Sequence, residues 1–140
     1  MKKSNLFTFF SFLFVQLLFA QKTVSDDKPD TILQKTTLYN LEGVDVKPVF
    51  PGGLTAFYSY ISRSYQTPQV KGLAGKVFTV FTIDIDGSIV DIKIIRELGH
   101  GTGEEAIRVL KESPKWSPGE KNGQKVKVLF SLPITIQTKK

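Results

Sequence analysis

The chain contains no cysteine and a single histidine, His100, among its 140 residues. Without cysteine it forms no disulfide, and it offers no thiolate to a metal ion. Structural zinc sites in proteins combine several Cys and His ligands, so one imidazole does not predict such a site. We therefore expect no metal, no cofactor and no lipid anchor attached through a cysteine.

Strong charge is also missing. The sequence has 19 Lys and Arg against 13 Asp and Glu, a net charge of +6, and two of the basic residues, Lys2 and Lys3, lie at the extreme N-terminus. The remaining basic residues are scattered, whereas nucleic-acid binding proteins gather them on one face or helix. We expect no nucleic-acid partner. The mild positive charge favours acidic surfaces or anionic polymers without specifying one.

Long apolar runs are limited to one, at residues 6–19. Lys2 and Lys3 precede this run and the small residue Ala20 follows it, which is the pattern of a secretory signal peptide over residues 1–20. The alternative is a retained membrane anchor. As a helix, residues 6–20 would cover about 22 Å, against about 30 Å for the hydrocarbon core of a bilayer. The length favours export and cleavage.

The rest of the chain divides into two parts. Residues 21–43 are polar at first and show no clean period, so we expect a flexible tether there. Residues 44–140 have the size of one small domain. The hydrophobic pattern predicts a strand at 44–49, a helix at 54–65, a hairpin at 75–95, a helix at 103–113 and a strand at 125–136. The predicted fold class is α+β: a small antiparallel sheet, order β-α-β-β-α-β, with both helices on one face.

Local signals support several of these elements. Asp86-Gly87 is a dipeptide typical of tight hairpin turns. Thr102 and Glu105 fit a capping box at the start of the second helix, and Pro114 ends that helix. We expect the ring of Trp116 to close the core.

No catalytic or metal-binding pattern stands up to the requirements of its chemistry. Asp84–Gly87 resembles the start of a calcium loop, but Ile95 occupies the position that needs a bidentate carboxylate. The glycines at 99, 101 and 103 resemble a phosphate cradle, but Glu104 and Glu105 would repel phosphate. His100 has no matching nucleophile motif. We therefore expect a protein that is not an enzyme.

A binding surface remains. The final strand alternates apolar and polar residues and carries lysines, which is typical of a sheet edge. An open edge can accept another extended strand, with backbone hydrogen bonds providing affinity and side-chain pockets providing selectivity. Edge strands can also pair between copies of one chain, so a dimer is possible.

Several ordered motifs in residues 75–136 resemble the C-terminal domain of TonB, the energy transducer of outer-membrane transport. They are Gly75-Lys76-Val77-x-x-x-Phe81-x-Ile83-x-x-Asp86-Gly87, Glu105-Ala106, Pro114-Lys115-Trp116-Ser117-Pro118-Gly119 and Asn122-Gly123. Phe50-Pro51-Gly52-Gly53 and the helix after it look like the version common in energy transducer TonB-like proteins of the Bacteroidetes type.

The resemblance implies a periplasmic protein-binding domain with a role in transmembrane transport. Its expected partner is the TonB box, a short extended segment of an outer-membrane TonB-dependent receptor, or a segment of another envelope protein. That segment would add beside the last strand, which maps to Val126, Lys127, Val128, Leu129, Phe130, Ser131 and Leu132.

Two further hypotheses about the partners of this protein remain. Family transducers have a retained anchor that meets inner-membrane motor proteins, so the motor is an expected partner only if residues 1–20 are retained. The other reading is a structural envelope module that binds peptidoglycan or itself, motivated by the positive charge and the open edge.

Overall fold

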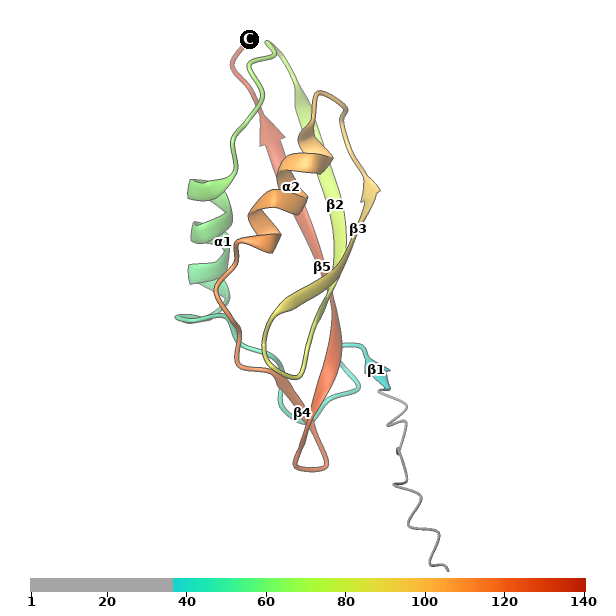
Figure 1. Ribbon diagram of the computed structural model, residues 1–140. Coiled ribbons are helices and arrows are strands. Elements are labelled where there is room, and N and C mark those ends of the chain that lie inside the picture. Colours follow the sequence, from blue (N-terminus) through green and yellow to red (C-terminus); the bar gives the residue numbers. More distant parts are fainter. Residues whose placement is uncertain (1–36) are drawn as a thin grey trace, which may run out of the picture. The chain divides into compact units, whose positions relative to one another are not determined.

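The computed structural model describes residues 37–140 (Figure 1). The predicted signal peptide and residues 21–36 of the predicted tether lie outside the described residues. Among those described, no helix is long and apolar enough to cross a membrane. The elements in chain order are β1 (Leu38–Tyr39), α1 (Gly53–Ser64), β2 (Ala74–Ile83), β3 (Ile89–Arg96), α2 (Thr102–Lys111), β4 (Gly119–Lys121) and β5 (Gln124–Gln137).

The sheet is built around β5, and its strand order is β1-β5-β2-β3. β2 and β5 run antiparallel through ten consecutive pairs, from Ala74 opposite Gln137 to Ile83 opposite Val128. β1 pairs with β5 in parallel, with Leu38 opposite Lys127 and Tyr39 opposite Val128. β4 forms a short hairpin with residues 124–126. β5 is therefore the strand that touches most of the others.

Both helices contribute to one core on one face of the sheet, as the sequence predicts. Phe57 and Ile61 of α1, and Ala106, Val109 and Leu110 of α2, are buried in the same cluster as the alternate residues of β2 and β5. Trp116 is 4% exposed and its ring lies 4.7 Å from that of Phe57 and 5.4 Å from that of Phe130. The prediction that Trp116 closes the core is confirmed.

The hairpin between β2 and β3 also follows its prediction. Gly87 has φ +84°, and its N–H donates to the Asp84 carbonyl at 2.9 Å. A Cβ at this position would lie 1.8 Å from the carbonyl oxygen of Trp116, so only glycine fits. The turn is therefore fixed both by its own conformation and by the segment that follows α2.

Three local predictions are wrong or incomplete. Residues 44–49 do not form a strand; they make two isolated bridges, Val46 to Glu120 and Val49 to Ser117, with Pro48 between them unable to donate a hydrogen bond. The short strand β4 was not predicted, because its three residues show no alternation of apolar and polar side chains. Leu38–Tyr39, inside the predicted tether, lies on the sheet as β1.

The predicted capping box is also wrong. The N-cap of α2 is Gly101, with φ +76°, and it makes no side-chain cap. The Thr102 hydroxyl instead donates to the Gly99 carbonyl at 2.7 Å. A carboxylate outside the predicted capping box accepts a hydrogen bond from the start of the helix. The Gly103 N–H donates to Glu97 Oε2 at 2.9 Å. Glu105 turns away from the helix start and accepts a hydrogen bond from the Gln66 N–H, just beyond the end of α1.

Candidate functional site

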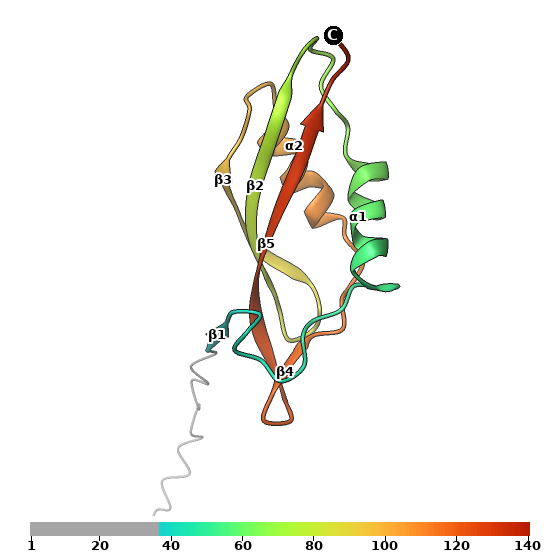
Figure 2. The same ribbon diagram turned by 180° about the vertical axis from the view of Figure 1, so that it is seen from behind.

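The two long sides of β5 have different surroundings. The inner side is paired with β2 from Val128 to Gln137. On the outer side, β1 occupies only the positions of Lys127 and Val128. Beyond them, residues 129–137 have no strand partner on the outer side among the described residues. This stretch, which we call the outer edge, is an open row of backbone groups (Figure 2).

Pro133 lies in the middle of the outer edge and indicates which backbone groups face outward. The Leu132 carbonyl accepts a hydrogen bond from the Thr79 hydroxyl of β2 at 3.1 Å, so it faces the inner side. In an extended strand the next nitrogen, that of Pro133, then faces outward, where a missing N–H leaves no ladder bond unmade. By alternation, the N–H groups of Ser131 and Thr135 also face outward.

A groove runs beside the outer edge, between β5 and α1. Its volume is about 340 Å³. One wall is formed by α1 residues and Thr67, and the other by β5; the lining residues are Tyr58, Ile61, Ser62, Tyr65, Thr67 and Leu132, Pro133, Ile134, Thr135, Ile136. Figure 2 shows α1 lying alongside β5 on the side away from β2. A strand added to the outer edge would therefore lie next to α1.

The walls of the groove carry almost no charge. Residues 129–137 contain no Asp, Glu, Lys or Arg. α1 has one charged residue, Arg63, in its last turn. A partner bound here would bury backbone and apolar groups without burying an unpaired ionised side chain. Burial of such a charge would oppose binding.

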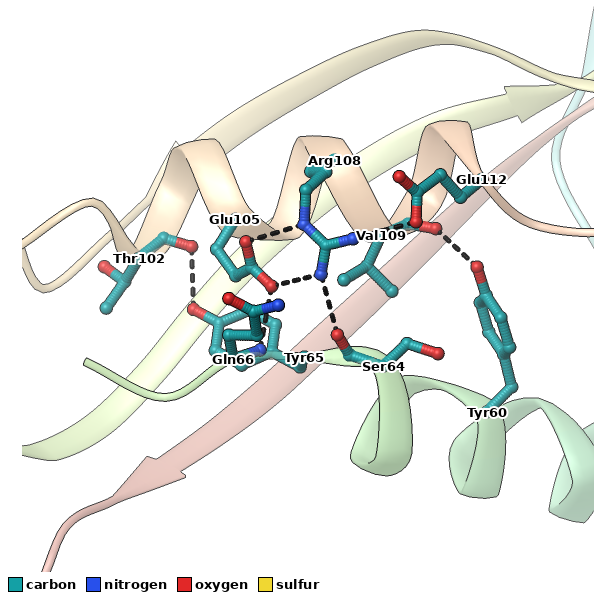
Figure 3. A network of polar contacts seen from close by, with 9 residues as sticks. All are labelled: Tyr60, Ser64, Tyr65, Gln66, Thr102, Glu105, Arg108, Val109 and Glu112. Carbon is teal, nitrogen blue, oxygen red and sulfur yellow. Dashed lines mark hydrogen bonds and ion pairs between the residues drawn. The ribbon is translucent and has the colours of Figure 1, made fainter. Parts of the chain in front are cut away.

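A polar network joins the C-terminal end of α1 to α2 (Figure 3). Arg108 of α2 pairs with Glu105 and Glu112, and its Nη2 donates to the Ser64 carbonyl at 2.8 Å. The Gln66 N–H donates to Glu105 Oε1, also at 2.8 Å. The hydrogen bond from Arg108 holds the pKa of the Glu105 carboxyl below its usual value, so this pair is ionised at neutral pH.

Two tyrosines of α1 complete this network. The Tyr65 hydroxyl donates to the Thr102 carbonyl at 2.7 Å, and the Tyr60 hydroxyl donates to the Val109 carbonyl at 2.8 Å. Burial is the largest cause that raises the pKa of Tyr65, and the nearby carboxylates Glu105 and Glu97 add to it, so that the pKa is about 12. The tyrosine therefore stays neutral and keeps its donor through the physiological range.

The family model for the C-terminal domain of the Gram-negative bacterial TonB protein matches residues 68–136. These residues belong to the TonB C-terminal domain family. The match covers β2, β3, α2, β4 and β5 up to Ile136, and so includes all but the last residue of the outer edge of this TonB domain.

Two solved structures of TonB C-terminal domains are similar to part of this chain. A solution structure of the TonB C-terminal domain of Helicobacter pylori is 27% identical over 62% of this chain and 81% of its own, with a TM-score of 0.45. That of the Pseudomonas aeruginosa TonB C-terminal domain is 21% identical over 72% of this chain and 96% of its own, with a TM-score of 0.39. Among curated protein sequences, no relative of this chain was matched.

Within the TonB domain, the residues predicted to bind a partner fall into three groups. Val126 pairs with Gly119 of β4, and Lys127 and Val128 pair with β1. The outer edge begins after them, so it includes the predicted residues Leu129, Phe130, Ser131 and Leu132 and continues to Gln137.

The sequence pattern missed the other wall of the groove. The apolar pattern predicts the helix at residues 54–65, but it does not indicate that Tyr58, which is 46% exposed, lines a groove. Pro133 is the residue in the sequence that indicates the open stretch, because a proline inside a strand is confined to sheet edges. It would have placed the open stretch farther along β5.

Proposed function

We propose that this protein is a non-enzymatic binding module of the periplasm. It binds an extended segment of an outer-membrane receptor, of the TonB-box type, or of another envelope protein, by strand addition to residues 129–137. The observation that supports this most directly is β1: the chain's own Leu38–Tyr39 already pairs with the same side of β5. This side of the strand therefore accepts an extended partner.

Strand addition would use the two features of the site differently. The outward backbone groups of β5 would bond to the partner's backbone, and alternate side chains of the partner would enter the groove beside Tyr58 and Ile61. At about 3.3 Å per residue, the nine residues of the outer edge span roughly 30 Å. Pro133 removes one possible bond near the middle. Affinity would come from the remaining bonds and from the filling of the groove.

In transport, this module would hold a receptor segment at the inner surface of the outer membrane. Inner-membrane motor proteins would join as partners if residues 1–20 are retained as an anchor. An intact-mass measurement of the native protein distinguishes the two forms, because cleavage after Ala20 removes the anchor.

A peptide titration tests the binding function. Peptides covering the N-terminal periplasmic segments of the receptors encoded in the same genome are titrated against the protein by calorimetry. Ser131→Pro removes an outward N–H that has no strand partner among the described residues, and it should reduce affinity at least 30-fold while the fold is retained. Ser131→Ala keeps this N–H and is the matched control. Equal affinity of the two variants would exclude strand addition at this edge.

Two other outcomes would redirect the function. If no peptide binds but the protein forms dimers that Ser131→Pro abolishes, the outer edge pairs with a second copy of the chain. If the protein instead sediments with purified cell wall in a salt-dependent way, peptidoglycan is the partner and the positive charge is the recognising feature. Sedimentation velocity and a cell-wall pull-down measure these outcomes.

A further inference from the structure

The two ends of α1 are held in place by different kinds of contact. At its N-terminal half, Phe57 is fully buried, and its ring lies 5.2 Å from that of Phe50 and 4.7 Å from that of Trp116. This half is anchored by apolar packing, which is dense and resists displacement. The apolar anchor belongs to the common core of the domain.

The C-terminal end of α1 adds polar contacts with α2 to the packing of Ile61 and Tyr65 in the core. The Ser64 carbonyl is among the last four of the helix, which have no partner within the helix, and Arg108 supplies a charged donor to it. The same guanidinium is held by Glu105, whose Oε1 also accepts the Gln66 N–H just beyond the helix. Figure 3 shows Glu105 and Arg108 projecting from α2 towards this end of α1. Arg108 and Glu105 thus hold the backbone on both sides of Tyr65, at the Ser64 carbonyl and at the Gln66 N–H.

This end also forms most of the α1 side of the groove. Ile61, Ser62 and Tyr65 line the groove on the α1 side. Tyr65 belongs to both, since it lines the groove while its hydroxyl donates to the Thr102 carbonyl of α2. Neither Glu105 nor Arg108 lines the groove. A change in this pair would therefore reach a bound partner only through the position of α1.

We propose that Glu105 and Arg108 are positioning residues that set the distance between α1 and the outer edge of β5, and with it the fit of the partner segment. This rests on the proposed function for its effect on binding. Its structural part, the placement of α1, does not depend on any partner.

The structural part is tested by a distance measurement without a partner. The chain has no cysteine, so spin labels attach only to Cys introduced at the exposed positions Arg63 of α1 and Lys93 of β3. Double electron–electron resonance should give a narrow distance distribution for the parent pair. Adding Arg108→Gln should broaden and shift it, Arg108→Lys should have a smaller effect, and Lys111→Gln on the same helix should have none.

The binding part uses the tightest receptor peptide from the titration. Arg108→Gln and Glu105→Gln should each weaken its binding about tenfold, and Arg108→Lys should recover part of this loss. Ile94→Val is the control for stability, because Ile94 packs against the core from β3, away from the groove. It should lower the thermal midpoint while the label distance and the Kd stay unchanged.

The outcomes separate the two proposals. An unchanged distance distribution in Arg108→Gln would overturn the positioning role, whatever the effect on stability. A changed distribution with an unchanged Kd would overturn the link to the partner. If no peptide binds the parent protein, the strand-addition function fails, and the distance measurement alone decides whether this pair positions α1.

Discussion

The two outermost long strands of the sheet, β3 and β5, present very different edges. β3 has eight residues, and three of them, Asp91, Lys93 and Arg96, are charged. Its pairing with β2 shifts register twice, and Asp91 has a positive φ of 52°. β5 has fourteen residues, pairs with β2 through ten positions without a shift, and is uncharged from 129 to 137. A groove between α1 and β5 also runs beside the open side of β5.

This difference between the two edges determines which of them is available to a partner. Charges and bulges on an edge strand prevent it from pairing with other strands. β3 carries both devices, so this edge is closed to strand addition although it has no strand on its outer side among the described residues. The outer edge of β5 has neither device, and Pro133 alone interrupts it.

The largest expected effect concerns how much each edge strand contributes to the core. Leu132 of β5 is 1% exposed, whereas Ile95 of β3 is 66% exposed. Leu132→Ala should lower the free energy of unfolding by about 2–5 kcal/mol. Ile95→Ala should change it by less than about 0.5 kcal/mol. Urea unfolding followed by the fluorescence of Trp116 measures both, and similar losses in the two variants would contradict the comparison.

An exchange of one protective charge between the edges should have an intermediate effect. Ser131→Lys gives the outer edge of β5 a charge like that of Lys93, and should weaken peptide binding about fivefold, corresponding to about 1 kcal/mol. The reverse change, Lys93→Ser, should leave peptide binding unchanged and increase self-association through β3. Calorimetry and sedimentation velocity measure the two results. Weaker peptide binding in Lys93→Ser would mean that β3 takes part in recognition.

The smallest expected effect is a dependence on acid to which the hairpin leading into β3 contributes. The hydroxyl and N–H of Ser88 donate to Asp86 and, with Lys115, lower the pKa of its carboxyl to about 2. Because the folded pKa lies below the ordinary value of 3.8 for this carboxyl, the ionised form stabilises the fold above about pH 4. This contribution is lost as the pH falls towards 2.

Asp86→Asn should therefore flatten the stability curve between pH 4 and 2, and Ser88→Ala, which removes the hydroxyl bond, should flatten it in part. Urea midpoints across this range measure the change. The turn that leads into β5 adds an acid dependence of its own, because the Asn122 N–H donates to Asp45 Oδ2 at 2.8 Å and lowers the pKa of that carboxyl. A curve in Asp86→Asn that still falls as steeply would show that the hairpin is not the acid-sensitive part.

Much of this architecture follows from local patterns. The alternation in residues 77–83 and 126–136, the Asp86-Gly87 turn and the helical stripe of α1 each point to one structure, and the structure confirms them. Buried alternation is readable because each side chain's environment depends on its own strand. The ordered motifs then indicate the family.

The site was harder to predict, because it depends on pairings between distant segments. Nothing in the residues of β1 indicates that they pair with Lys127 and Val128 and so displace the open stretch towards the C-terminus. The three residues of β4 have no pattern of their own. Arg108 and Ser64 are 44 positions apart, and a side chain that bonds to a backbone carbonyl leaves no trace in the pattern.

The parallel direction of β1 has a mechanical consequence. The chain enters β1 beside Lys127 and runs in the same direction as β5. If a partner on the outer edge is pulled towards the Gln137 end while the protein is held at residue 37, the tension lies along the strands. The hydrogen bonds of the added strand are then loaded in shear and share the force, whereas a pull across the sheet would unzip them one at a time. Single-molecule pulling in these two geometries would show whether the rupture force is higher along the strand.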